Sequence, residues 1–398
     1  MLNPVAPSRT AIPFDAARLD RLMEEAGIDV LVATSKHNVQ YLTGGHRAFF
    51  FDYMDAMGLS RYLPVFVYAK GAPAKAAFFG HRLEGFQTQN DPLWVAEVQA
   101  SSSGSVDVIA KAVAHIRKAG IPARRIGAEL SFLPVDSHAA LRDAFPDSKI
   151  VDALFVLERL RAVKSADELA KLKVASEAVI DSMLAVIARH GPGATKRELT
   201  EALRREETNR GLIFEYCLIT AGTSLNRAPS EQRWDKGDIL SLDSGGNYHG
   251  YIGDLCRMAI HGEPDAELND LLGEIEAIQR AAMKPIRAGV MGAEIYAAAD
   301  PLVRASKQHN HMHFLAHGMG LVSHEAPRLT ASGPVPYDAY DATRPLEAGM
   351  VVSVETTLAH PQRGFIKLED TVVVTDRGFE IFGEGGRGWN KGGTAAAG

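Results

Sequence analysis

Two aspartates, Asp243 and Asp254, lie in the stretch 238–254, which reads DILSLDSGGNYHGYIGD. A short apolar run ends at Asp243, and the turn formers at 244–247 (Ser-Gly-Gly-Asn) predict that the chain reverses there. An extended pattern restarts at Tyr248 and ends at Asp254. Two aspartates on neighbouring strands can point into one cavity, an arrangement that hard divalent cations prefer. The alternative is that both carboxylates only cap a hairpin.

The C-terminal half carries more polar residues in apolar settings. Glu355 ends the run MVVSVE, Glu369 lies between FIKL and TVVV, and His317 lies among glycines in AHGMG. A carboxylate in an apolar strand is costly to bury unless it is paired or bound to metal. For either glutamate alone, a solvent-facing strand edge is the favoured interpretation. Together with the two aspartates and the histidine, they suit a pair of cations such as Mn²⁺, Co²⁺, Fe²⁺ or Zn²⁺.

The composition is that of an ordinary globular protein large enough for two or three domains. The chain has 398 residues, of which 46% are hydrophobic and 23% charged, and its net charge is -6. This charge gives no support to a nucleic-acid partner, and no apolar run is long enough to span a membrane. The N-terminus lacks the pattern of a secretory signal. With only Cys217 and Cys256, we expect a reduced, cytoplasmic protein without a disulfide framework.

The elements that must position these residues form two α/β domains. We expect an N-terminal domain at 1–162 and a C-terminal catalytic domain at 163–398, because Ser165 and Glu168 have the spacing of a capping box that starts a long helix. Thr195 and Glu198 repeat that spacing. In the N-terminal domain, strands are expected at 28–33, 63–68, 75–79 and 125–128, alternating with helices. An aromatic segment, 49–53, is expected to pack in a core or subunit contact, or to cover a substrate pocket.

The C-terminal domain is expected to mix long helices with strands that carry the polar residues. Strands are predicted at 216–220, 239–242, 257–260, 350–355 and 371–375. Helices are predicted from 165 toward 188, at 265–288 and at 292–309.

Over nearly its whole length the sequence resembles the creatinase–prolidase–aminopeptidase P group of "pita-bread" metallohydrolases. The resemblance rests on GIDVLVATSKHNVQYLTG, LRAVKSADELAKLKVA, LDSGGNYHGYIGD, AHGMGLVSHEAP, LEAGMVVSVE and IKLEDTVVVT. It implies a smaller N-terminal α/β domain, a C-terminal domain with a curved antiparallel sheet backed by helices, and a homodimer. It also implies two divalent metal ions, Mn²⁺ before Co²⁺, Zn²⁺ or Fe²⁺. The metal ligands it implies are Asp243, Asp254, His317, Glu355 and Glu369.

The chemistry expected of such a centre is amide hydrolysis. Two cations can hold a hydroxide that attacks a carbonyl carbon and can stabilise the oxyanion that forms. The resemblance gives Glu355 the transfer of the proton to the leaving nitrogen. His324 lies outside the ligand set and seven positions beyond His317, so it is our candidate to bind the substrate and donate a hydrogen bond to the tetrahedral intermediate. The alternative for His324 is a structural histidine bonded to a backbone carbonyl.

The sequence departs from the peptidases of this group around the substrate pocket. Ser230 stands where they carry a histidine, and Lys367, which we assign to substrate binding, stands where they commonly carry arginine. His360 is a candidate replacement for the missing histidine, although a surface-loop histidine is the more ordinary reading.

Three functions follow from these observations. The first is a metallopeptidase acting on Xaa-Pro dipeptides or short peptides. The second is a small-molecule C–N hydrolase or lyase on the same scaffold, similar to ectoine hydrolase, creatinase or dimethylsulfoniopropionate lyase. The third is a binding module without catalysis, which the complete ligand set disfavours.

Overall fold

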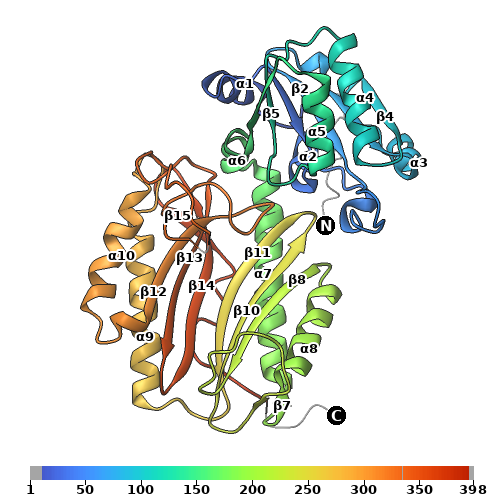
Figure 1. The fold of residues 1–398 in the computed structure, drawn as a ribbon. Coiled ribbons are helices and arrows are strands. Elements are labelled where there is room, and N and C mark those ends of the chain that lie inside the picture. The colour runs from blue at the N-terminus through green and yellow to red at the C-terminus, as the bar shows by residue number, and fades with distance from the viewer. Residues whose placement is uncertain (1–10, 334, 394–398) are drawn as a thin grey trace. The chain divides into compact units, whose positions relative to one another are not determined.

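The computed structural model describes residues 11–333 and 335–393. Its contacts divide the chain into two compact units, Met1–Leu160 and Arg161–Gly398, a division two residues before the one that the sequence suggests. Figure 1 shows both units as mixtures of helices and strands.

The N-terminal unit is a six-stranded mixed sheet between two layers of helices. The sheet order is β4-β3-β2-β1-β5-β6, in which β1 runs parallel to β5 and antiparallel to β2. One apolar cluster packs residues of α1, α2 and α6 on one face, and a second packs α4 and α5 on the other. The bounds are α1 Ala16–Glu25, β1 Val30–Ala33, α2 Lys36–Leu42, β2 Val65–Ala69, β3 Ala77–His81, α3 Gly85–Asn90, β4 Glu97–Ser102, α4 Ser105–Lys118, β5 Arg125–Ala128, α5 Val135–Ala144, β6 Lys149–Asp152 and α6 Leu154–Ala162.

The two edge strands of this sheet are the strands of this unit that the sequence pattern did not reveal. The sequence of β4 (EVQASS) is mostly polar, that of β6 (KIVD) is half polar, and both strands are largely half-buried or exposed. An edge strand has a neighbour on one side only and needs no apolar run, so periodicity gives little signal there. The aromatic segment forms a short 3-10 helix, Phe49–Asp52.

The C-terminal unit is built on an eight-stranded sheet backed by helices (Figure 1). Its main path is β12-β13-β14-β11-β10-β8, and every neighbouring pair on that path is antiparallel. Helices α7 and α8 pack against β8, β10 and β11, and α9 and α10 pack against the other half. The bounds are α7 Ala166–Arg189, β7 Ala194–Thr195, α8 Lys196–Asn209, β8 Ile213–Ala221, β9 Arg233–Trp234, β10 Ile239–Tyr248, β11 Tyr251–Ile260, α9 Ala266–Met283, α10 Ala293–Ala305, β12 Met312–Gly318, β13 Val351–His360, β14 Gly364–Val374, β15 Phe379–Phe382 and β16 Asn390–Lys391.

Both predicted capping boxes are confirmed. The side chains of Ser165 and Thr195 accept the backbone N–H groups of Glu168 and Glu198, and each glutamate accepts the N–H of its capping residue in return. These contacts satisfy N–H groups that a helix start otherwise leaves free. They therefore fix where α7 and α8 begin.

The predicted turn at 244–247 is wrong. Strand β10 runs through Gly245 and Gly246, and the chain reverses at His249 and Gly250, which have φ angles of 52° and 98°. Positive φ at both central residues is what a type I′ hairpin requires. Gly245 serves close packing instead, because a Cβ there would lie 2.3 Å from the ring of Tyr216.

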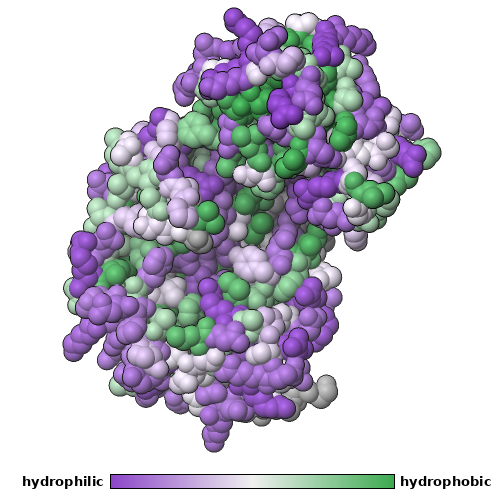
Figure 2. Space-filling view, viewed as in Figure 1, coloured by the Kyte–Doolittle hydropathy of each residue, from purple (hydrophilic) through white to green (hydrophobic). Residues whose placement is uncertain are grey.

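The face of each unit that Figure 2 shows is mixed in hydropathy. Figure 2 shows hydrophilic and hydrophobic residues interspersed over the visible face of each unit. Within residues 11–333 and 335–393, no helix is both long and apolar enough to cross a membrane.

Candidate metal centre

Five strands bring the candidate ligands onto one face of the sheet. Asp243 pairs with Cys256, and Asp254 lies two residues before Cys256, so the two aspartates are diagonal neighbours on β10 and β11. Alternation of side chains along a strand places both on the same face.

The remaining ligands come from β12, β13 and β14. Glu355 pairs directly with Glu369, and His317 pairs with Ser353, two residues before Glu355. Cys256 also pairs with Glu369, and this register joins the two halves of the sheet at the site. The alternation that buries one face therefore also gathers residues more than 120 positions apart in the sequence.

These side chains form overlapping groups in which one potential ligand atom from each residue lies within 4.8 Å of the others. One group is His317, Glu355 and Glu369, and another is Asp243, Asp254 and Glu369. Glu369 is common to both. Two sets of donors that share a carboxylate have the composition expected of a site for two hard or borderline cations.

The imidazole of His317 is oriented as a metal ligand requires. Its Nδ1 donates to the carbonyl oxygen of Gly318 at 3.2 Å, which leaves Nε2 to face the carboxylates. Nε2 is buried, makes no hydrogen bond within the described residues, and lies 3.6 Å from Glu369 Oε1. A ligating histidine commonly has its other ring nitrogen fixed in this way.

Lys367 is buried among the same carboxylates. Its Nζ lies 2.7 Å from Asp243 Oδ2, 2.5 Å from Glu355 Oε2 and 2.8 Å from Glu369 Oε2. The guanidinium of Arg227 also pairs with Asp243 Oδ2 and stacks over the ring of Phe365. The centre therefore holds two protein cations as well as four carboxylates.

Burial and crowding shift the pKa values of these groups in different directions. Burial, Glu369 and Asp243 hold the pKa of Asp254 well above its usual range. Burial also raises the pKa of Asp243, to about 6, although Lys367 partly offsets it. For Glu369 the effect of burial is outweighed by Lys367 and His317, which lower its pKa. Carboxylates that resist ionisation together are stabilised by any further cation that binds between them.

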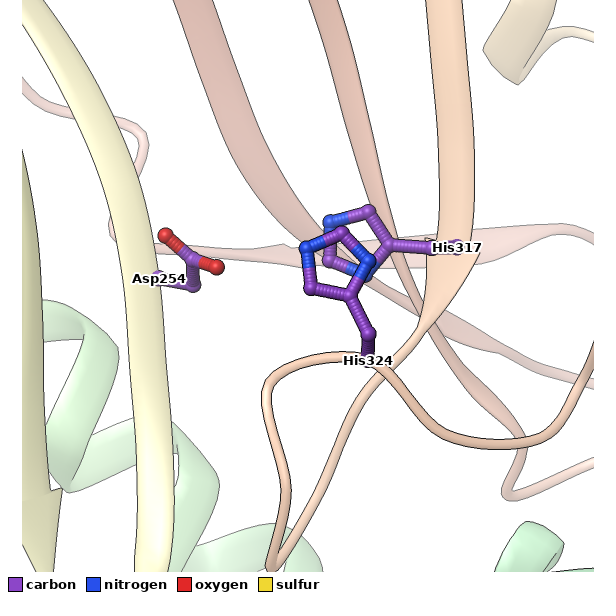
Figure 3. A group of neighbouring side chains, drawn as sticks. All are labelled: Asp254, His317 and His324. Carbon is purple, nitrogen blue, oxygen red and sulfur yellow. The ribbon is translucent and has the colours of Figure 1, made fainter. Parts of the chain in front are cut away.

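His324 lies against the centre. Its ring stacks on that of His317, with centroids 3.8 Å apart and planes 17° from parallel. Figure 3 shows both rings on one side and Asp254 opposite them, on β11. Burial, followed by the proximity of His317, lowers the pKa of His324 to about 4. His324 also forms a ligand group with Asp254 and His317.

Ser230 and His360, the two positions singled out near the pocket, make structural contacts. The carbonyl of Ser230 accepts the N–H of Arg197 at the start of α8. His360 is buried at the end of β13, where its Nδ1 accepts the N–H groups of Gln362 and Arg363, so it closes a turn.

Two residues near the aspartates were missed in the sequence. Arg227 lies only three residues from Ser230, in the segment that departs from the peptidases. Tyr216 lies opposite Gly245, and its pKa is raised well above the usual value by burial and by Asp254, to which it is hydrogen-bonded. A bulky residue facing a glycine across a strand pair is a signal that only the register of the pair reveals.

Comparisons with known proteins agree with this architecture. Residues 170–376 match the family described as "Metallopeptidase family M24", and residues 16–163 match the "Creatinase/Prolidase N-terminal domain". The "Probable dipeptidase PepE" of Mycobacterium tuberculosis is 30% identical over 368 residues, covering 89% of each chain. The Xaa-Pro dipeptidase of Pyrococcus furiosus is 26% identical over 229 residues, which cover 56% of this chain and 63% of that protein.

A solved structure shows the same fold. The Xaa-Pro dipeptidase from Bacillus anthracis superposes with a TM-score of 0.77 at 24% identity, covering 93% of this chain and 96% of that one. The M24 match spans more than half of the sequence and includes all the candidate ligands. The chain therefore belongs to the metallopeptidase family M24, carries a creatinase/prolidase-type N-terminal domain, and is a hydrolase whose family implies divalent metal ions.

Proposed function

We propose that this protein cleaves the amide bond of Xaa-Pro dipeptides or short peptides with two divalent ions held by Asp243, Asp254, His317, Glu355 and Glu369. Relatives that are Xaa-Pro dipeptidases support the substrate class. The two ligand groups that share Glu369 support the number of ions.

One observation carries the proposal most directly. The lone pair of His317 Nε2 has no hydrogen-bond donor within the described residues, and the hydrogen bond from Nδ1 to the carbonyl of Gly318 orients the imidazole. This buried and oriented nitrogen lies 3.6 Å from Glu369 Oε1 and 4.0 Å from Glu355 Oε1, a placement suited to binding the same cation as those carboxylates. When bound, such ions polarise a carbonyl group and lower the pKa of a water molecule.

Glu355 is the proposed general base and acid. Its side chain is 12% exposed, compared with 3% for Asp243 and 1% for Glu369, so it is open to the solvent from which a water enters. A carboxylate in this place can take the proton of the attacking water and deliver it to the leaving nitrogen.

His324 and Lys367 are the proposed substrate-side residues. A neutral imidazole still has one N–H, and from its place on His317 that group can donate to the oxygen of the tetrahedral intermediate. Lys367 holds Glu355 at 2.5 Å, so its proposed contribution includes orienting the general base.

The proposal also includes the identity of the metal, the oligomeric state and the cellular compartment. The ions are Mn²⁺, the chain forms a homodimer, and it works in the cytoplasm. The oxygen-rich donor set supports Mn²⁺, and the family resemblance supports the dimer. The two buried, unpaired cysteines are compatible with a reducing compartment.

The test is proline release from a panel of Xaa-Pro dipeptides by the purified Mn²⁺-loaded protein. Glu355→Gln keeps the size of the side chain and removes its basicity, so it should retain the fold and lose release by about 10²-fold or more. Retained release in that variant would falsify the assignment of Glu355. A metal-loaded wild type that releases no proline from any peptide would refute the peptidase and favour a small-molecule C–N substrate.

A further inference from the structure

The loop that carries His324 is held by a buried ion triad. Glu325 Oε2 accepts from Arg161 Nη2 at 2.8 Å, and Glu325 Oε1 accepts from Lys164 Nζ at 3.1 Å. The three side chains are 1–2% exposed. Arg161 and Lys164 belong to the first residues of the C-terminal unit, far from Glu325 in sequence.

The triad is tied to the catalytic strands through the backbone. The N–H of Lys164 donates to the carbonyl of Gly349, and Val163 bridges Met350 immediately before β13. The N–H of Glu325 donates to the carbonyl of Gly318, which directly follows His317 on β12. Glu325 is thus fixed both to the strand that carries His317 and to the start of the strand that carries Glu355.

Gly320 packs closely against the triad. A Cβ at Gly320 would lie 2.4 Å from Glu325 Oε1 and 2.9 Å from Lys164 Cε. The carbonyl of Gly320 accepts the N–H of Ile252, two residues before Asp254. The loop therefore closes tightly over Glu325 and is anchored to β11 as well.

His324 depends on this anchoring because its own ring has few restraints. Within the described residues its buried Nδ1 has no hydrogen-bond partner, and the contact that orients the ring is the stack on His317. A ring with few restraints follows its backbone, and the next residue, Glu325, is held through its side chain by the triad and through its N–H by the carbonyl of Gly318.

Stability alone is a weak explanation for such a triad. Taking three charges out of water costs about as much as their attraction returns, so apolar residues of similar volume often serve stability equally well. What a buried ion network does supply is a single geometry.

We propose that Glu325, clamped by Arg161 and Lys164, is a positioning residue that sets the place of the His324 imidazole over the metal centre. The inference rests on the proposed role of His324 in the reaction. It assigns a function to residues that touch neither the substrate nor the ions.

The test compares Glu325→Gln with His324→Ala and with the double variant, all metal-loaded. Glu325→Gln should lower kcat about tenfold or more with little change in KM or metal content, because a misplaced group affects the transition state more than binding. If Glu325 acts through His324, the double variant should have the kcat of His324→Ala within about twofold. A double variant whose kcat is lowered by the product of the two single losses would overturn the proposal.

A second readout is independent of substrate. Modification of histidines by diethylpyrocarbonate, mapped by peptide mass, should be several-fold faster at His324 in Glu325→Gln and unchanged at buried His190, whose Nδ1 contacts the carbonyl of Val186. Glu206→Gln is the matched control, since Glu206 also pairs with two cationic side chains, Arg189 and Arg210, but lies on α8. An unchanged rate at His324 in folded Glu325→Gln would overturn the proposal.

The two readouts separate the possible failures. If the wild type releases no proline but the modification rate at His324 rises in Glu325→Gln, the positioning inference stands and the proposed function fails. If Glu325→Gln does not fold, Lys164→Gln, which keeps the Arg161–Glu325 pair, takes its place. A rise at His324 there supports the proposal, and an unchanged rate overturns it.

Discussion

Lys367 Nζ lies 2.5 Å from Glu355 Oε2, so the proposed general base and a buried ammonium are in direct contact at the centre. The same ammonium contacts Asp243 and Glu369, one carboxylate from each strand pair. It neutralises part of the negative charge that would otherwise attract metal ions. We therefore expect the affinity of the site for metal to depend on Lys367 as well as on the proposed ligands.

Replacing Lys367 by methionine should tighten metal binding and destabilise the metal-free protein. The repulsion between a unit charge and a divalent ion about 4 Å away is worth several kcal/mol even when well screened. Because the variant lacks this repulsion, its Kd for Mn²⁺ should fall about tenfold or more. The metal-free variant should lose about 3–5 kcal/mol, because three buried carboxylates lose their partner. Chelator competition and thermal unfolding measure the two effects. Lys367→Arg, which keeps the charge, is the control, and equal Kd values for wild type and Lys367→Met would contradict the account.

Ser353 should matter for metal affinity although it is not a ligand. Its hydroxyl donates to Glu369 Oε1 at 2.7 Å and fixes the carboxylate that both ligand groups share. Loss of such a supporting contact typically costs about 10–100-fold in metal affinity, and this is the expected effect of Ser353→Ala. Ser182→Ala is a matched control, because that buried hydroxyl donates within α7. Equal metal affinities of the two variants would count against the role of Ser353.

Gly245→Ala should be destabilising because the new methyl group would collide with the ring of Tyr216. Overpacking of this kind costs about 1–3 kcal/mol and should also displace Tyr216 from Asp254. The matched substitution is Gly273→Ala on α9, where nothing lies within 4 Å of the added carbon. There we expect a gain of up to about 1 kcal/mol. Urea unfolding measures both, and a neutral Gly245→Ala would refute the packing argument.

The candidate ligands and the hairpin show which features of the site could be predicted from the sequence. The order Asp, Asp, His, Glu, Glu is readable because each candidate ligand interrupts or ends an apolar run and the flanking motifs resemble those of the family, and the structure gathers all five in overlapping groups. The hairpin turn was misplaced because a Gly-Gly pair signals a turn and a close approach equally well. The aromatic ring that requires Gly245 comes from β8, and no local pattern reports it.

The cations of the site were harder to predict than its carboxylates. Lys367 is on the same strand as Glu369, so alternation places it on the site face. Arg227 and the Arg161–Lys164–Glu325 triad depend on contacts between residues far apart in the chain. Such pairings follow from the register and curvature of the whole sheet, which the sequence does not display locally.

Stability should depend on pH through Glu207, whose carboxyl group is buried on α8 and accepts the hydroxyl of Ser244. Burial raises its pKa to about 8 from a model-peptide value of 4.5. Between these two pH values the folded protein retains a proton that the unfolded chain has released. Stability from this group is thus fully present below about pH 4.5 and is lost as pH rises toward 8, by at most about 1.4 kcal/mol per pH unit.

Glu207→Gln should remove this dependence, because the amide still accepts from Ser244 and has no proton to lose. The free energy of unfolding, measured in urea at pH 5 and pH 8, should fall more in the wild type than in the variant. Identical falls in the two proteins would show that Glu207 does not carry the effect.

The central claim is that proline release requires divalent ions at this centre. The most direct measurement is to strip the protein with a chelator, add Mn²⁺ in known equivalents, and follow proline release from an Xaa-Pro dipeptide in the same samples. We predict no proline release without metal, and release that saturates at about two equivalents of Mn²⁺ per chain. His317→Ala should not regain proline release at those Mn²⁺ concentrations. Release by the stripped protein, or release that His317→Ala recovers as the wild type does, would contradict the claim.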